Sequence, residues 1–200
     1  MRQPSPTPTR GTTLVEVMIA SALLLLVMVG LTTVFVGAYR YQRATTYLTE
    51  VQSQSLLATS AVTRELAESS AGSVRIDSAP MGIVFGSPRG VDGALLRDAE
   101  GNPLWRKLIC FYLDTMNGIP VLVRKEELLA SPDTNPPVVL PTQGTAYFQG
   151  LDVPREVVAR HVTGFTVSGT NPVALEFEVS RSDGPRLFAI TNQMRVLLRN

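Results

Sequence analysis

Glu16 is the residue of this sequence whose surroundings most require a chemical explanation. It follows the uncharged residues 12–15 and precedes an uncharged, largely apolar stretch, residues 17–39. A carboxylate at mid-bilayer depth costs roughly 2–3 kcal/mol, and less near the end of a membrane segment. The segment contains no cation, so the candidate partners are Arg10 and a group from another chain. The alternative is an acid that only benefits from the dipole at a helix start, which is worth a few tenths of a kcal/mol.

The chain has one histidine, His161, and one cysteine, Cys110. A catalytic histidine needs a nucleophile and an orienting acid, and the sequence contains no G-x-S-x-G motif. Cys110 lies in the apolar run 108–112, which is typical of a buried, unreactive thiol. A single cysteine also excludes an intrachain disulfide and a cysteine-based zinc site. We therefore expect no enzyme activity and no catalytic residue.

A cluster of oxygen-bearing side chains is the only candidate for a metal site. Its members are Asp92, Asp98, Glu100 and Asn102. Their spacing lacks the bidentate glutamate that completes a calcium loop of the EF-hand type, so the pattern is more typical of a solvated turn. We expect neither a metal nor a cofactor.

Nucleic-acid binding is not indicated either. The chain has 18 Lys and Arg against 17 Asp and Glu, a net charge of +1, which leaves no excess of cations for phosphates. Arg155, Arg160 and His161 stand beside Glu156 and are typical of ordinary surface.

The stretch from residue 17 to residue 39 is long enough to cross a bilayer as a helix, which takes about 20 apolar residues. A secretory signal peptide has a shorter apolar region, about 7–15 residues, and a small-residue cleavage site after it. Here Arg40 and Arg43 follow instead. A membrane anchor is therefore the better interpretation of this segment.

The residues around Glu16 resemble the N-termini of type IV prepilins and of the pseudopilins of type II secretion. The match runs Arg10-Gly11-Thr12-Thr13-Leu14-Val15-Glu16-Val17-Met18-Ile19-Ala20, after a short leader with arginines and no acid. The resemblance implies that a prepilin peptidase cuts between Gly11 and Thr12 and N-methylates Thr12. It also implies that Glu16 pairs with the terminal amine of a neighbouring subunit. Thr12 departs from the family, where Phe or Met is usual, and no proline follows about twenty residues into the helix.

This resemblance implies a non-enzymatic filament subunit of a pilus or a secretion pseudopilus. Residues 195–200 look like the last strand of PilW-type minor pilins, and the β-rich head resembles J-type minor pseudopilins. The implied partners are other pilin or pseudopilin subunits, the prepilin peptidase, the inner-membrane assembly platform and the membrane itself. The head would lie outside the cytoplasm, and the subunit would prime assembly or sit at the tip.

Two rival interpretations remain open. One is a single-pass anchored extracytoplasmic binding domain unrelated to pili, in which Glu16 is incidental. The other is a membrane-tethered hydrolase. Cleavage after Gly11 would separate the filament subunit from both.

A helical period continues beyond the apolar stretch. Positions 44, 48, 51, 55, 58, 62 and 66 trace one face, which Leu57 and Ala61 widen, and Gly72 is a plausible stop after residue 70. We expect this half of the helix to pack on the chain's own sheet. The expected organisation is a leader at 1–11, a membrane and assembly half-helix at 12–39, an extramembrane half at 40–72 and a head at 73–200.

The head is expected to be built of strands. Runs 82–86 and 104–113 are apolar, and Asn117-Gly118 predicts a hairpin turn into a strand at 119–124. Four prolines predict an irregular loop at 131–145. Alternation at 165–168 and 173–180 predicts a meander that turns at Asp183-Gly184 into 186–190. Residues 194–198 either continue this strand or add another. The expected fold class is α+β, with a long N-terminal transmembrane helix continuing into a helix packed on antiparallel sheet.

Overall fold

The computed structural model describes residues 11–90 and 92–199. The chain divides into two units, residues 1–46 and residues 47–200. The expected leader, apart from Gly11, and the arginines at positions 2 and 10 lie outside the described residues.

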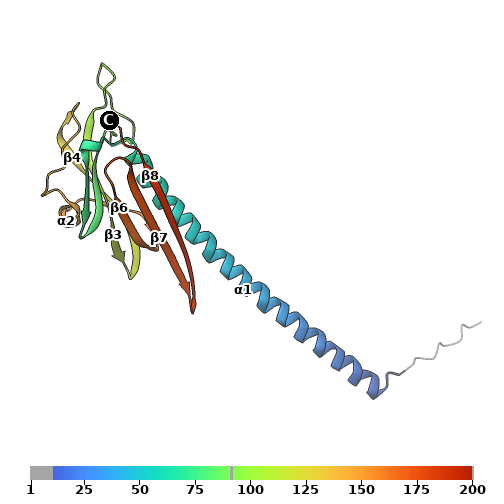
Figure 1. Cartoon of the computed structure of the whole chain (residues 1–200). Helices are drawn as coiled ribbons and strands as arrows, with labels where there is room; N and C mark the ends of the chain where they lie inside the picture. The colour runs from blue at the N-terminus through green and yellow to red at the C-terminus, as the bar shows by residue number, and fades with distance from the viewer. Residues whose placement is uncertain (1–10, 91, 200) are drawn as a thin grey trace, which may run out of the picture. The chain divides into compact units, whose positions relative to one another are not determined.

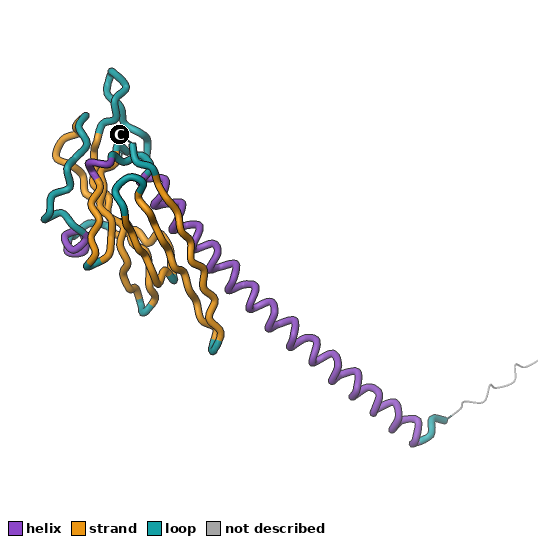
Figure 2. Tube along the Cα trace, in the orientation of Figure 1, coloured by secondary structure: helices purple, strands orange, loops and turns teal. Residues whose placement is uncertain are grey.

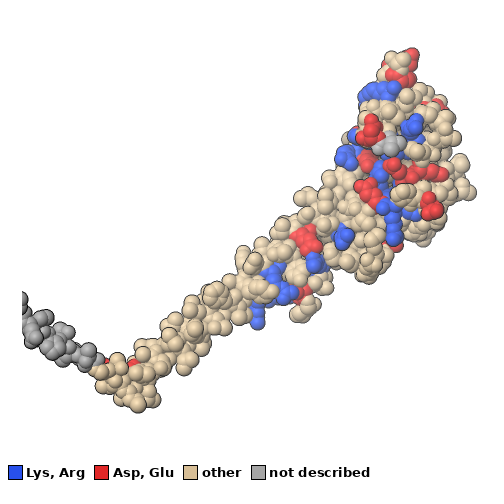
Figure 3. Space-filling model, turned by 180° about the vertical axis from the view of Figure 1, so that it is seen from behind, with Lys and Arg blue, Asp and Glu red and all other residues tan. Residues whose placement is uncertain are grey.

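One helix, α1 (Leu14–Leu66), accounts for almost all of the described part of the first unit (Figure 2). The described residues up to position 43 are all exposed, including the long apolar side chains. This helix is long and apolar enough to cross a membrane, with a mean hydropathy of 2.6 over its most apolar window. Figure 3 shows the uncharged length of this helix, beyond which acidic and basic side chains gather. A membrane-capable helix near the N-terminus is therefore present, as expected.

The helix ends earlier than its sequence suggests. α1 stops at Leu66, four residues before the expected end, and Gly72 lies in a short 3-10 helix, η1 (Ala71–Ser73). The backbone amide of Arg199 donates to the carbonyl of Ser69, and the amide of Ala71 donates to the carbonyl of Arg199. The peptide groups of Ser69 and Ala71 therefore bond to the C-terminal segment instead of forming further helical hydrogen bonds.

Five antiparallel strands form the larger sheet of the second unit, in the order β1-β2-β3-β4-β5. The strands are β1 (Val74–Ser78), β2 (Met81–Ser87), β3 (Trp105–Met116), β4 (Ile119–Asp133) and β5 (Arg155–Arg160). The predicted hairpin is confirmed: Asn117 and Gly118 have φ of 53° and 78° and join Met116 to Ile119. Positive φ at both positions is the requirement of a type I′ turn.

Strand β4 is longer than predicted and includes residues expected to be loop. It runs to Asp133, so the irregular segment begins after that residue rather than at 131. The pairing of β3 with β4 is irregular between Trp105 and Lys107, and Pro132 lies opposite this interruption. A bulge tolerates a proline because no ladder hydrogen bond is required there.

The predicted C-terminal meander is confirmed as a second sheet, in the order β6-β7-β8 (Figure 1). Its strands are β6 (Val162–Ser168), β7 (Val173–Asp183) and β8 (Arg186–Val196). The apolar positions of β7 are buried in alternation, as their spacing predicts. Of the two alternatives for residues 194–198, the structure shows the continuation, since β8 pairs with β7 without a break from Arg186 to Val196.

Both faces of the five-stranded sheet are covered, which explains why its central strands are apolar at nearly every position. On one face Phe85 and Leu122 pack with α1 and the second sheet. On the other face Val84 and Val123 pack with Phe148 of α2 (Thr145–Gly150). The short helix α2 was not predicted, and it begins at the last residue of the expected loop, Thr145. Gly82 has no side chain because a Cβ there would stand 2.6 Å from Oγ1 of Thr145.

The second half of α1 packs on sheet, contacting β5, β7 and β8, so the α+β class is confirmed. The buried positions of this part of the helix are Val51, Ser55, Ala58, Thr59, Val62, Glu65 and Leu66. Five of them belong to the predicted face. The expectation was wrong for Leu48 and Leu57, which are 45% and 47% exposed. Thr59 and Glu65 are buried instead because each has a polar partner on a strand, Asn192 and Arg124 respectively.

Candidate functional site

The carboxylate of Glu16 and the hydroxyl of Thr13 cap the start of α1 reciprocally. The backbone amide of Thr13 donates to Oε2 of Glu16 at 2.9 Å, and the backbone amide of Glu16 donates to Oγ1 of Thr13 at 3.3 Å. This is a capping box, which satisfies two amides that the helix itself leaves without partners. Sequence reasoning missed it, although Thr13-x-x-Glu16 before an apolar run is its local signature.

The capping bond fixes where the Glu16 charge lies. It holds the carboxylate over the first turn of α1, next to Thr13, which directly follows Thr12. A carboxylate has about four acceptor positions, so one amide hydrogen bond leaves capacity for an additional cation. The arrangement combines an acid at a helix N-terminus, which the dipole favours, with proximity to the residue that cleavage would turn into a chain end.

Gly11 and Thr12 lie in an exposed, non-helical segment directly before α1. A Cβ at Gly11 would meet nothing within 4 Å. The peptide bond between these residues is therefore open to an approaching protein. Of the sequence-predicted residues, Gly11 and Thr12 lie directly before the first turn of α1, and Glu16 lies within that turn.

The apolar half of α1 also contains hydroxyl groups, and these are satisfied within the helix. Ser21, Thr32 and Thr33 donate to the carbonyls four residues earlier, at 2.7, 2.7 and 2.9 Å. Such back-bonding removes the cost of placing a hydroxyl in an apolar environment. The surface of this half-helix is thus compatible with lipid or with other apolar helices.

Comparison of the sequence with models of protein families, and of the chain with curated proteins and solved structures, finds no match.

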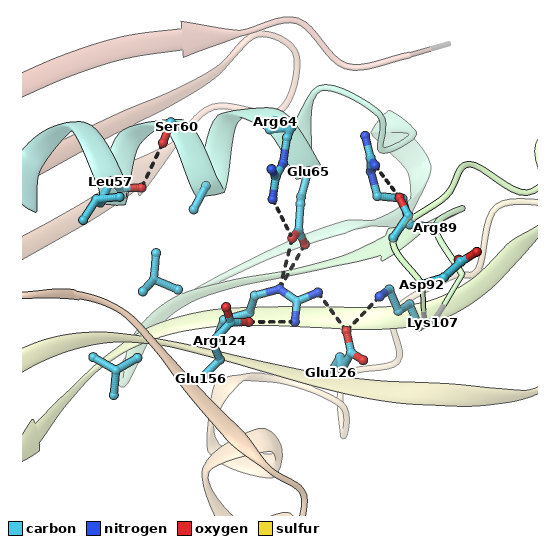
Figure 4. A pocket seen from close by; sticks show the side chains of 14 residues that line it. Leu57, Ser60, Arg64, Glu65, Arg89, Asp92, Lys107, Arg124, Glu126 and Glu156 are labelled. Atoms are coloured by element: carbon cyan, nitrogen blue, oxygen red, sulfur yellow. Dashed lines mark hydrogen bonds and ion pairs between the residues drawn. The ribbon is translucent and has the colours of Figure 1, made fainter.

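A second candidate site is a charged cleft of about 810 Å³ in the second unit, between α1, β3, β4 and β5. At its centre Arg124 of β4 donates to Glu65 of α1, to Glu126 at 2.8 Å and to Glu156 at 3.4 Å (Figure 4). Lys107 binds Glu126 as well, at 2.8 Å. The cleft therefore contains interlocked ion pairs from a helix and three strands.

These ion pairs are better suited to stabilising the fold than to acid–base catalysis. Burial alone would raise the pKa of Glu126, but hydrogen bonds from Lys107 and Arg124 outweigh it and lower the pKa. Burial disfavours the charge of Arg124, yet Glu65 and Glu126 raise its pKa overall. Groups locked in their charged forms do not exchange protons near neutral pH. The cleft fixes α1 against the sheet.

Cys110 and His161 occupy places that argue against catalysis. Cys110 is fully buried, and burial raises its pKa to about 12, so no thiolate forms. His161 lies between β5 and β6 with a φ of 61°, and its Nε2 is 3.9 Å from Oε1 of Glu50. Burial, followed by the charge of Arg160, lowers the pKa of His161. The lowered pKa disfavours the charged form of the imidazole.

The oxygen-rich segment around Asp98 forms a turn. Asn102 donates its backbone amide to Oδ1 and its side-chain amide to Oδ2 of Asp98, at 2.7 and 2.9 Å. Hydrogen bonds from Asn102, opposed by slight desolvation, lower the pKa of Asp98. Within residues 11–90 and 92–199, His, Cys, Asp and Glu side chains do not gather in a group of three or more that could hold a metal ion.

Two charged residues bind the ends of α2, and neither was predicted as a site residue from the sequence. Oδ2 of Asp77 accepts the backbone amide of Thr145 at 2.5 Å. The buried ammonium of Lys125 donates to the carbonyls of Phe148 and Leu151, both at 2.8 Å. An acid at the N-terminus and a cation at the C-terminus match the helix dipole. No local pattern in the sequence predicts this, since Asp77 and Lys125 come from β1 and β4.

Proposed function

We propose that this chain is a minor type IV pilin-like subunit, which assembles into a pilus or a secretion pseudopilus after its leader is removed. The observation that carries the proposal is the position of the Glu16 carboxylate, which caps the first turn of an exposed apolar helix four residues after Thr12. Cleavage between Gly11 and Thr12 would create an ammonium group four residues before a carboxylate that has capacity for an additional cation. The resemblance of residues 10–20 to prepilin N-termini points to the same chemistry.

The apolar half of α1 supports this function. A helix whose apolar side chains are all exposed needs a non-aqueous environment. A membrane supplies it before assembly, and the packed helices of a filament supply it afterwards. The removal of residues 1–11 would also remove the arginines that precede the membrane segment. The head would then stay outside the cytoplasm, while the helix moves from the inner membrane into the filament.

One observation favours a second candidate, the single-pass anchored binding domain. The capping box gives Glu16 a role within its own chain, so a neighbouring amine is not required to explain the residue. The two functions differ in processing, since an anchored domain keeps its leader and a filament subunit loses it.

Processing provides the test. The full chain should be produced with and without a prepilin peptidase, and its N-terminus determined by intact-mass and peptide mass spectrometry. A filament subunit should begin at Thr12, with an additional methyl group on the amine, only when the peptidase is present. Gly11→Leu should block the cut without affecting insertion. An N-terminus at Met1 with active peptidase, or a cut near Gly37, would eliminate the proposed function.

A further inference from the structure

Strand β4 has a free edge next to the start of β5. β5 pairs with β4 only over Val121–Lys125, whereas β4 pairs with β3 on its other edge through Leu128 and, after the irregularity, again at Asp133. Pro154 directly precedes β5 and has no amide hydrogen to donate, which ends the ladder. Among the residues that the structure describes, no strand pairs with Glu126, Glu127 or Leu128 on that side.

A groove of about 570 Å³ opens at this edge. Its lining includes Glu126, Glu127 and Leu128 from β4, together with Leu151, Val153 and Pro154 from the segment before β5. Successive residues of a strand point to opposite faces of the sheet. A groove that touches three successive residues therefore opens onto the strand edge rather than onto one face. Leu128 is 52% exposed in this groove.

Glu127 contributes a carboxylate oxygen to this groove that lacks a hydrogen-bond donor. Its Oε1 accepts a hydrogen bond from the hydroxyl of Tyr147 at 2.6 Å. Its Oε2 is buried and lacks a hydrogen-bond partner within the described part of the chain. A buried carboxylate oxygen without a donor is costly, and charged donors such as ammonium or guanidinium groups satisfy it best.

We propose that an extended segment of another protein adds to the sheet at Glu126–Leu128 of β4, with a Lys or Arg side chain placed on Glu127. The edge amides and carbonyls of β4 supply the main-chain hydrogen bonds of strand addition. Glu127 and Leu128 face opposite sides of the sheet. The added strand therefore carries a basic residue opposite Glu127, and an apolar neighbour of that residue fits beside exposed Leu128, because neighbouring side chains alternate in the same way.

A second copy of this chain does not fit the same edge. Antiparallel self-pairing centred on Glu127 would place Glu127 opposite its own copy, and like charges in directly opposed positions destabilise a sheet. Arg124, Glu126 and Glu156 also line the groove, but they pair with one another, which leaves the Oε2 atom of Glu127 as the acceptor available to a partner. The edge selects a basic partner. This inference depends on the second unit alone, so it stands or falls independently of leader cleavage.

Binding of short blocked peptides to the isotope-labelled full chain in detergent micelles tests the proposal. The probe is acetyl-Thr-Val-Lys-Val-Thr-amide, and the control peptide has Glu in place of Lys. At millimolar concentration the Lys peptide should shift the amide resonances of residues 126–128. Glu127→Gln, which keeps the acceptor for Tyr147, should weaken its binding about tenfold, as expected for loss of one charge-assisted hydrogen bond.

Two further measurements separate strand addition from loose electrostatic attraction. N-methylation of alternate amides in the Lys peptide should abolish binding, because it blocks the main-chain hydrogen bonds. Leu128→Lys, at an exposed position, should reduce binding of the Lys peptide by repulsion while the spectrum stays that of a folded protein. No shift at residues 126–128, or equal binding of the Lys and Glu peptides, would overturn the proposal.

Discussion

The guanidinium of Arg124 binds Glu65 across the interface between sheet and helix, with Nε at 3.1 and 3.2 Å from the two carboxylate oxygens. Their side chains are only 13% and 8% exposed. A buried pair of this kind sets which turn of α1 lies over β4, because any shift along the helix would take the buried Glu65 carboxylate away from its closest cation.

Removal of one partner of this pair should therefore be strongly destabilising. We expect Arg124→Met to lower the free energy of unfolding by about 3–5 kcal/mol, since Glu65 stays buried without its cation. Arg155→Met is the matched control: the Arg155–Asp114 pair is half exposed and should be worth less than about 1 kcal/mol. Urea unfolding followed by the fluorescence of Trp105, which is buried in the second unit, measures both. Equal losses in the two variants would contradict this assignment.

The same cleft should give the second unit an acid-sensitive stability. The pKa of Glu126 is lower in the folded state than its ordinary value of 4.5. Its contribution is therefore fully present above about that pH and is lost as the pH falls through the folded pKa. Unfolding free energies measured between neutral pH and the acid range should decline below this point, and Glu126→Gln should make the decline shallower. An unchanged slope in the variant would show that other carboxylates cause it.

The ammonium of Lys125 should be needed to hold α2. Lys125→Met keeps the length of the side chain but leaves the carbonyls of Phe148 and Leu151 without their buried donor. We expect a loss of about 1–3 kcal/mol in the free energy of unfolding. Arg186→Met, at an exposed cation of β8, should stay within about 0.5 kcal/mol of the wild type. A loss no larger than that of this control would mean that water replaces the ammonium.

Substitutions of Glu16 should separate its charge from its capping role. Glu16→Gln keeps an acceptor for the Thr13 amide and removes the charge, whereas Glu16→Ala removes both. If a neighbour's amine pairs with Glu16, both variants should insert into the membrane and be cleaved, yet fail to enter filaments, because a buried unpaired cation costs about 3–5 kcal/mol. Thr13→Ala weakens the cap and keeps the charge, so it should still be incorporated.

Co-purification of each cleaved variant with sheared filaments or partner subunits decides this point. Normal incorporation of cleaved Glu16→Gln would refute an assembly role for the charge. Failure of Thr13→Ala together with normal Glu16→Gln would assign the importance of the segment to the cap alone.

Sequence by itself determined those features whose cause lies within a few neighbouring residues. The apolar stretch before Arg40 requires a non-aqueous environment wherever it is placed. Asn117-Gly118 tolerates the positive φ of a tight hairpin, and the alternation from Val173 to Val179 dictates which face of β7 is buried. The cap formed by Thr13 and Glu16 is equally predictable from the sequence, since a capping box depends only on spacing and residue type.

Tertiary structure alone decided the features that depend on residues far apart in the chain. α1 ends at Leu66 because the C-terminal segment at Arg199 binds the peptide groups of Ser69 and Ala71. Glu65 and Lys125 are buried because Arg124 and the carbonyls of α2 reach them, whereas residue type alone would place both in solvent. Likewise, the groove beside Glu127 exists only because Pro154 ends the pairing of β5 with β4. Such partners are set by topology, which brings together groups that no local pattern relates.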